Sequence, residues 1–196
     1  MYEPGAERDR ILTAALEVLR RHNGEEATVA DILQEAGLST RAFYRHFETK
    51  EDVIRALYER DAKSFGRHLR SRVDAAGDPQ EALEVWVNET LGLGYDRRRS
   101  ERVSALGSPM VLRVMAGYPS ASIGVDELVE PLREVLHAGR AAGVFPSALP
   151  DVDSFAIRAL ALEVVGWTRS GNPHLTRRQA LELVLRFSRG ALGAAP

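Results

Sequence analysis

Two arginines and a tyrosine lie at helical spacing in one short segment near the start of the chain. Phe43 and Phe47 are four residues apart there, so a helix places both on one face, which we expect to be buried. The opposite face then carries the side chains at i, i+3, i+4 and i+7, which are Arg41, Tyr44, Arg45 and Glu48. The segment is therefore predicted to present two guanidinium groups and a phenol outward together.

This outward group has the chemistry of a contact in the DNA major groove. An arginine can donate two parallel hydrogen bonds to O6 and N7 of guanine. The hydroxyl groups of Thr40 and Tyr44 can reach phosphate oxygens. Residues 39–50 carry three basic side chains and one acidic side chain, a net charge of +2. The pattern therefore predicts a local basic surface that suits duplex DNA.

Two short helices, over residues 28–36 and 39–47, are predicted to position this group. Thr28 is suited to cap the first helix, because its hydroxyl can accept a hydrogen bond from a free amide of the first turn. Gly37 suits the left-handed conformation that ends a helix, and Ser39 or its neighbour Thr40 is suited to cap the second helix. This spacing is that of a helix-turn-helix.

The overall charge does not by itself indicate a nucleic-acid-binding protein. The 196 residues include 26 Lys and Arg against 28 Asp and Glu, a net charge of −2, and residues 1–50 alone are also at −2. A protein that coats nucleic acid without sequence preference is normally basic, so a site here depends on local placement of charge. The absence of cysteine excludes disulfides, thiolate metal sites and cysteine nucleophiles.

Apolar residues recur at three- and four-residue spacing along almost the whole chain, which predicts an all-α fold. Capping residues, glycines and prolines predict where the other helices begin and end. Asp96–Ser100 is predicted to be a solvated loop. Pro131 is predicted either to kink the helix over about 123–142 or to mark its true start. We expect helices over about 6–22, 50–72, 79–95, 123–142, 151–169 and 177–190, with short helices across 101–118.

Other chemistries have weak support. Gly92-Leu93-Gly94 lies inside an expected helix with no strand before it, so it is not a dinucleotide-binding loop. The five histidines lack metal-ligand spacing, and no nucleophile or phosphate-loop motif occurs. We therefore expect no cofactor, no metal site and no enzymatic activity. The apolar runs are far shorter than the ~20 residues that span a bilayer, and the N-terminus is charged, so we expect a cytoplasmic protein without membrane contact.

The run TVADILQEAGLSTRAFYRHFETKEDVIRAL, after a helix that ends in HNGEEA, resembles the N-terminal domain of the TetR family of transcriptional regulators. The resemblance covers about residues 8–57. One departure is Leu33, where the family more often has alanine, and we expect it to affect helix packing. The residues that carry the resemblance are Thr28-Val29, Ile32, Ala36-Gly37, Ser39, Phe43-Tyr44, Phe47 and Lys50-Glu51.

The resemblance implies an all-α homodimer in which residues 1–49 form a three-helix DNA-binding head and residues 50–196 form a ligand-binding and dimerisation domain. It implies that the helix over about 50–72 connects the two. Ser39 is also placed in the DNA interface. His46 is a further candidate for a phosphate contact; the alternative is that it borders the core of the head. The implied phosphate contacts are Thr28, Thr40, Tyr44 and Lys50, and the implied base-facing residues are Arg41, Ala42 and Arg45.

Arg8 and Arg10, which precede the apolar part of the first helix, have two readings. They could reach the DNA backbone or the minor groove, or they could simply be solvated. Arg97-Arg98-Arg99 resembles a nucleic-acid-binding tract, but Asp96 and Glu101 flank it. We therefore expect that tract to be a solvated loop or an interdomain contact.

The last two expected helices are apolar over more than the single stripe that packing within one subunit requires. A second buried face predicts a homodimer through a four-helix bundle, with ordinary packing inside the chain as the alternative. The residues predicted to form the interface are Phe155, Ala159, Leu162, Leu181, Val184, Leu185 and Ser188.

The middle of the chain is predicted to bind a small hydrophobic or amphipathic effector between its helices. Any one of the large side chains there could instead be plain core, and Glu163 is a hydrogen-bonding anchor only if it is buried. The candidate ligand residues are Trp86, Met110, Met115, Tyr118, His137, Glu163 and Trp167.

Together these patterns favour a transcriptional repressor that an effector releases from a pseudo-palindromic operator in double-stranded DNA. Three alternatives stay open. One is an activator without effector-driven release. Another is a helical small-molecule carrier or enzyme with an incidental helix-turn-helix. The third is an adaptor that docks a protein partner.

Overall fold

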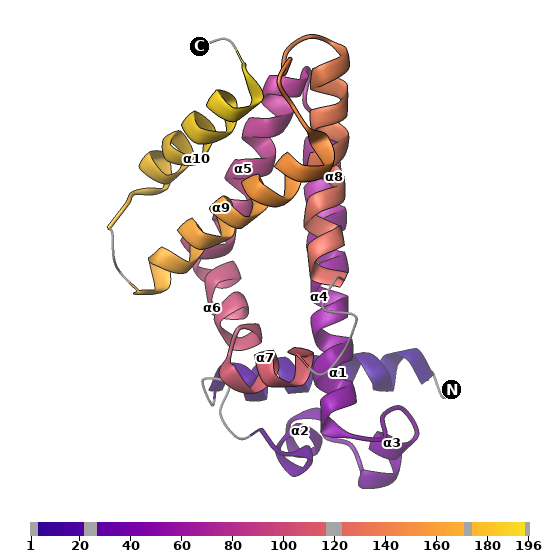
Figure 1. Cartoon of the computed structure of the whole chain (residues 1–196). Helices are drawn as coiled ribbons and strands as arrows, with labels where there is room; N and C mark the ends of the chain where they lie inside the picture. Colours follow the sequence, from indigo (N-terminus) through magenta and orange to yellow (C-terminus); the bar gives the residue numbers. More distant parts are fainter. Residues whose placement is uncertain (1–3, 22–26, 117–122, 171–173, 195–196) are drawn as a thin grey trace. The chain divides into compact units, whose positions relative to one another are not determined.

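The computed structural model describes residues 4–21, 27–116, 123–170 and 174–194, and these are all-α (Figure 1). Within these ranges no helix is both long enough and apolar enough to cross a membrane. The helices are α1 (Pro4–Arg21), α2 (Val29–Ala36), α3 (Thr40–Tyr44), α4 (Lys50–Asp74), α5 (Pro79–Tyr95), α6 (Arg97–Leu106), α7 (Pro109–Ala116), α8 (Ile123–Ala141), α9 (Pro150–Ser170) and α10 (Arg177–Leu192).

Side-chain caps set several of these boundaries, as the sequence predicts. The Asp78 carboxylate accepts hydrogen bonds from the first amides of α5, directly before a proline at the first helical position. Thr176 and Gln179 form a reciprocal capping box at the start of α10. Gly143 after α8 and Gly193 after α10 have φ of 72° and 68°, in the left-handed region that favours glycine.

The chain divides into two compact units. The head unit comprises residues 1–62 and 101–124, and the body unit comprises residues 63–100 and 125–196. Helix α4 therefore contributes its first half to the head unit and its second half to the body unit. The compact units do not follow the predicted boundary at residue 50, and the division of functions at that boundary remains a prediction.

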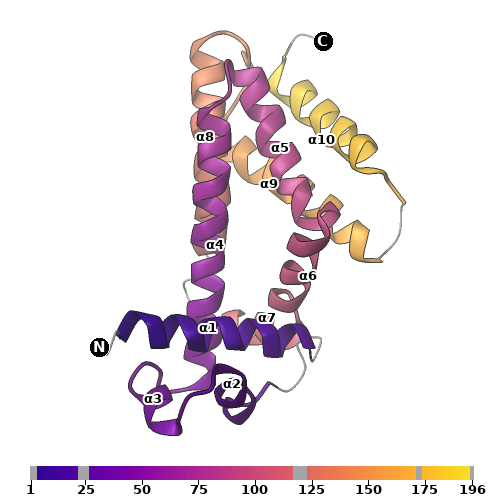
Figure 2. The same cartoon turned by 180° about the vertical axis from the view of Figure 1, so that it is seen from behind.

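The core of the head unit is built around α1, which packs against α2 (Figure 2). Ile11, Val18 and Leu19 on α1 are 0–1 % exposed. The first half of α4 adds Val53 and Leu57 to the same cluster, both fully buried, and α6 and α7 add further side chains. Burial of several large apolar side chains, each contributing about 1.5–3 kcal/mol, stabilises this small unit.

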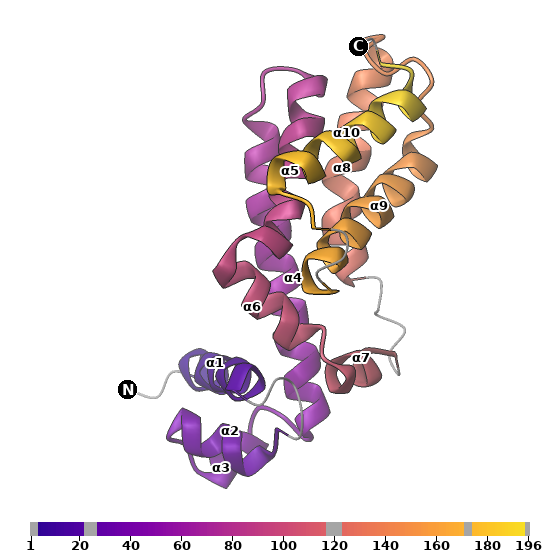
Figure 3. The same cartoon turned by 90° about the vertical axis from the view of Figure 1, so that its left-hand side faces the viewer.

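The core of the body unit lies between α5, α9 and α10, which contact one another pairwise (Figure 3). Trp86 of α5 is fully buried, and its indole nitrogen donates a hydrogen bond to the carbonyl of Leu128 at 3.0 Å. This bond satisfies the one polar atom of the largest core side chain. Leu83 of α5 and Val184 of α10 are also fully buried in this cluster.

Some helix boundaries differ from the predictions. The segment predicted as a loop at Asp96–Ser100 is the start of α6, because the Asp96 carboxylate accepts a hydrogen bond from the Arg99 amide at 3.0 Å and acts as a cap. Helix α9 begins at Pro150, one residue before the start predicted at about 151, and the Asp153 carboxylate accepts a hydrogen bond from the Leu149 amide at 2.7 Å. Pro131 lies inside α8 without ending it.

Candidate nucleic-acid interface

Three local features hold the turn between α2 and α3. The Thr28 hydroxyl accepts a hydrogen bond from the Asp31 amide at 3.1 Å, and the Asp31 carboxylate accepts from the Thr28 amide at 3.0 Å. Gly37 follows α2 with φ of 60°, and Ser39 caps α3 by accepting from the Ala42 amide at 3.3 Å. These features close the turn of a helix-turn-helix and confirm the predicted caps.

The two phenylalanines turn inward as predicted. Phe43 is 0 % and Phe47 6 % exposed, and their ring centroids are 6.1 Å apart. Helix α3 is shorter than predicted, since it ends at Tyr44. The Phe47 amide still donates to the Phe43 carbonyl at 3.0 Å, so one more helical turn brings the second ring back to the core. Tyr44, between them, is 60 % exposed.

The outward side of this turn carries the predicted polar group. Thr40, Arg41, Tyr44 and Arg45 are all exposed, and Lys50 is half-buried at the first position of α4. The structure therefore leaves the predicted arginines and hydroxyls exposed, whereas the two phenylalanines lie in the core of the head unit.

Two of the predicted DNA-contacting residues, Thr28 and Ala42, are engaged or buried within the head unit. The Thr28 hydroxyl donates to the Asp31 carboxylate at 2.6 Å, so a phosphate must compete with this capping partner. Ala42 is 3 % exposed, which contradicts the prediction that it faces the bases. Ala42 and its neighbour Phe43 are the two buried residues of α3, so the alanine methyl lies on the covered part of that helix.

Sequence reasoning missed Glu7, which lies on α1 beside the end of α3. Its carboxylate accepts hydrogen bonds from Nη2 of Arg45 at 2.8 and 3.1 Å. The same carboxylate lies 3.2 Å from Nε2 of His46, whose side chain is only 10 % exposed. Glu7 is 38 residues from Arg45 in the chain, so no local spacing signals this contact.

Two arginines of α1 also hold the helix-turn-helix in place. Nη2 of Arg10 donates to the carbonyl of Ala36 at 2.7 Å, which satisfies a free carbonyl at the end of α2. The guanidinium of Arg8 lies over the ring of Phe47, 5.3 Å from its centroid. In this structure both side chains contact the helix-turn-helix, which is a third role beside the two that the sequence left open.

The predicted ligand residues do not gather in one place. Trp86 is fully buried in the body core, whereas Met115 is 6 % exposed and packs in the core of the head unit. His137 is exposed. Glu163 is also exposed and accepts a hydrogen bond from the indole nitrogen of half-buried Trp167 at 3.0 Å. The side chain of Met110 and the whole of Tyr118 lie outside the described residues.

The predicted dimer residues separate into two groups. Val184, Leu185 and Ser188 of α10 are 0 %, 5 % and 2 % exposed, so this chain's own core covers them. Phe155 is 43 % exposed and Ala159 is also exposed. Leu162 and Leu181 are half-buried. Only the exposed and half-buried residues of this set can contact a partner chain, because side chains that are already packed in a close-packed core have no free surface.

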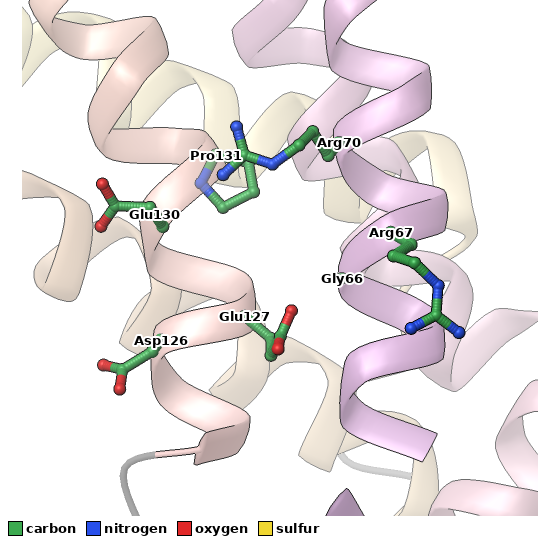
Figure 4. A pocket seen from close by; sticks show the side chains of 7 residues that line it. All are labelled: Gly66, Arg67, Arg70, Asp126, Glu127, Glu130 and Pro131. Carbon is green, nitrogen blue, oxygen red and sulfur yellow. The ribbon is translucent and has the colours of Figure 1, made fainter. Parts of the chain in front are cut away.

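A cleft of about 280 Å³ lies between α4 and α8 in the body unit. Figure 4 shows Arg67 and Arg70 on one side and three carboxylates of α8 on the other. Gly66 allows this close approach, since a Cβ there would lie 2.9 Å from Cβ of Glu127. Of the predicted ligand residues whose side chains the structure describes, none lines the cleft, and its charged walls do not suit an apolar ligand.

The body unit also holds a nearly buried carboxylate that sequence reasoning missed. Glu89 of α5 accepts hydrogen bonds from Nη1 of Arg99 at 2.9 Å and lies 2.9 Å from Nε2 of His68. Arg72 is 3.4 Å away. Burial raises the pKa of Glu89, but the hydrogen bonds and charges of His68 and Arg99 outweigh it and lower the pKa to about 2.

We expect Glu89 to make the stability of the protein depend on pH. Its folded pKa of about 2 lies below its ordinary value of 4.5, so its stabilisation is complete above pH 4.5 and is lost as the pH falls towards 2. The shift corresponds to about 3 kcal/mol at most, and exposed partners reduce this to about 2 kcal/mol. Urea unfolding at pH 7, 4.5 and 3 measures it.

Glu89→Gln should flatten that decline between pH 4.5 and 3. Glu84→Gln is the matched control on the same helix, because Glu84 forms one exposed ion pair with Arg189 at 3.2 Å. Equal pH profiles for wild type and Glu89→Gln would contradict the assignment.

These features define a protein of the helix-turn-helix class: a capped short helix, a turn at a glycine and a second short helix with outward cations. Residues 11–57 match the family model described as bacterial regulatory proteins, tetR family. This N-terminal segment is therefore similar to the DNA-binding segment of TetR-family regulators.

Similar curated proteins match part of the chain. The repressor NicS of Pseudomonas putida is 28 % identical over 141 residues, which cover 70 % of this chain and 65 % of NicS. An uncharacterised helix-turn-helix-type transcriptional regulator of Mycobacterium tuberculosis is 28 % identical over 88 residues. That match covers 45 % of this chain and 44 % of the relative, so the chain matches less than half of the relative's length.

Solved structures resemble the whole chain. The fatty acid degradation regulator FadR of Bacillus halodurans is 22 % identical, with a TM-score of 0.75 over 96 % of this chain and 97 % of that chain. FadR of Bacillus subtilis, in complex with stearoyl-CoA, is 17 % identical, with a TM-score of 0.70 over 93 % of this chain and 97 % of that chain. At these identities the likeness concerns the fold.

Proposed function

We propose that this chain is a transcriptional repressor that binds a pseudo-palindromic DNA operator as a homodimer and releases it when an effector binds. The observation that carries the proposal is the outward polar side of the helix-turn-helix. Arg41 and Arg45 are exposed there, beside the Tyr44 hydroxyl, because Phe43 and Phe47 occupy the core. A short helix with this surface fits the major groove.

Each group in this surface has a proposed role. Arg41 and Arg45 donate to base edges, where an arginine can distinguish guanine from the other bases. Thr40, Tyr44 and Lys50 bind phosphates and fix the orientation of the helix on the duplex. Thr28, Ser39 and His46 are proposed to add further contacts to the DNA. Lysine suits the last role because its compact ammonium group binds phosphate as a point charge.

Dimerisation follows from the apolar surface of α9. Val152, Phe155, Ala156 and Ala159 are exposed at three- and four-residue spacing, which places them on one side of the helix. Phe187 of α10 is 56 % exposed as well. A two-fold pair of these helices would cover both surfaces in a four-helix bundle and would present two recognition helices.

The effector is proposed to be a small amphipathic molecule bound in the body unit. NicS is named as a transcriptional repressor, which supports repression. FadR of Bacillus subtilis was solved in complex with stearoyl-CoA, which supports a response to a ligand. Release requires that the effector bind one state of the dimer better than the other by about 1–3 kcal/mol.

Selection of bound fragments from random duplex DNA tests this function directly. We expect enrichment of an inverted repeat that the dimer protects in footprinting. A panel of small molecules that includes acyl-CoA thioesters should then contain a compound that releases the selected duplex, and an in vitro transcription assay on that duplex should show repression. Recovery of no enriched sequence would refute DNA-binding regulation, and activation would refute repression.

Arg45→Ala is expected to weaken operator binding by about 1–3 kcal/mol and to relax preference at one base pair per half-site. Lys50→Ala is the contrasting variant, since loss of a phosphate contact weakens all sequences alike and lowers the salt slope by about 1. Competition binding with operators mutated at single positions separates the two. Unchanged discrimination in Arg45→Ala would show that this side chain does not read a base.

A further inference from the structure

The contact between Glu7 and Arg45 involves the same guanidinium that the proposed function assigns to base reading. Two distances, 2.8 and 3.1 Å, join Nη2 of Arg45 to the two carboxylate oxygens of Glu7. An arginine that reads guanine uses two donors, either both terminal nitrogens or Nε with the neighbouring terminal nitrogen. Nη2 belongs to both pairs, so the carboxylate occupies the nitrogen that base reading needs.

Glu7 is held in place independently of Arg45. Nε2 of His46 lies 3.2 Å from the same carboxylate, and the His46 side chain is only 10 % exposed. Glu7 itself is 20 % exposed, on a helix that packs against α2. The carboxylate therefore keeps a contact with His46 when Arg45, whose side chain is 46 % exposed, is removed from it.

We propose that Glu7 is a built-in competitor of DNA for Arg45, so that operator binding must first break this ion pair. The inference rests on the proposed function, because it assumes that Arg45 contacts DNA. Its consequence is that wild-type affinity for the operator is lower than the interface alone would give. An exposed ion pair is weak, so the competition changes affinity by a small factor.

Removal of the competing charge should tighten binding. Glu7→Gln keeps the size of the side chain but loses its charge, and we expect operator affinity to rise about 2- to 5-fold. In an Arg45→Ala background Glu7→Gln should have no effect on operator affinity, because the guanidinium that Glu7 binds is absent. Equilibrium titration of the selected operator with the full-length chain measures all four variants.

Asp9→Asn is the matched control. Asp9 is exposed on the same helix, two residues beyond Glu7, and its loss removes the same charge from the same domain. We expect little change in operator affinity. An increase as large as that of Glu7→Gln would show a general effect of charge near DNA and would overturn the proposal.

The other outcomes are also decisive. Weaker operator binding by folded Glu7→Gln would show that Glu7 only supports the structure, which overturns the proposal, as would an increase that survives in Arg45→Ala. Thermal unfolding establishes that each variant is folded. If the wild type binds no selected duplex, the proposed function itself fails. If it binds and Glu7→Gln changes nothing, the competition alone fails.

Discussion

Phe43→Ala should destabilise the head unit by about 3–5 kcal/mol and abolish operator binding at moderate temperature. The Phe43 ring is fully buried in the head core and contacts the ring of Phe47, with centroids 6.1 Å apart. Truncation of a buried phenylalanine loses its transfer free energy and leaves a cavity. Domains are stable by only about 5–15 kcal/mol, so this loss is a large part of the total.

Urea unfolding followed by circular dichroism measures the change in the free energy of unfolding. Tyr44→Ala, at the next position, is the matched control because Tyr44 is 60 % exposed and contacts the Phe43 ring only by its edge. We expect it to cost less than about 1 kcal/mol of stability, although it removes a proposed phosphate contact. Equal destabilisation by both variants would contradict the inward placement of Phe43.

Phe155→Glu should convert the proposed homodimer into monomers and reduce operator affinity by a factor of about 10²–10⁴. Phe155 is 43 % exposed on α9, next to exposed Val152 and Ala156, so a charge there meets its own copy across a two-fold axis. A monomer binds with one recognition helix and loses the gain from linking two contacts.

Analytical ultracentrifugation gives the oligomeric state, and titration of the full and half operators gives the affinities. Leu112→Glu is the matched control, because Leu112 is an apolar side chain of α7 that is 55 % exposed in the head unit. This variant should remain dimeric. A dimeric Phe155→Glu that binds the operator normally would refute the proposed interface.

Local chemistry was sufficient to predict most helix boundaries and the turn of the helix-turn-helix. Thr28, Gly37 and Ser39 act on amides and carbonyls within a few residues, so their types and spacing alone predict the caps. The inward phenylalanines follow from four-residue spacing for the same reason. The loop predicted at Asp96 was wrong, because an aspartate before a helix and one in a loop look alike until the next amide bonds to it.

Contacts between residues far apart in the chain required the tertiary structure. Glu7 contacts Arg45 because α1 passes beside the end of α3. Glu89 contacts both His68 and Arg99 because α4, α5 and α6 lie close together at that point. The burial of Ala42 was likewise found only in the tertiary structure. Helical periodicity shows which side of a helix is apolar, but the partner of each side chain depends on how helices cross. The sequence therefore determined the all-α class, the helix-turn-helix and the outward cations, and only the tertiary structure decided which carboxylates bind them.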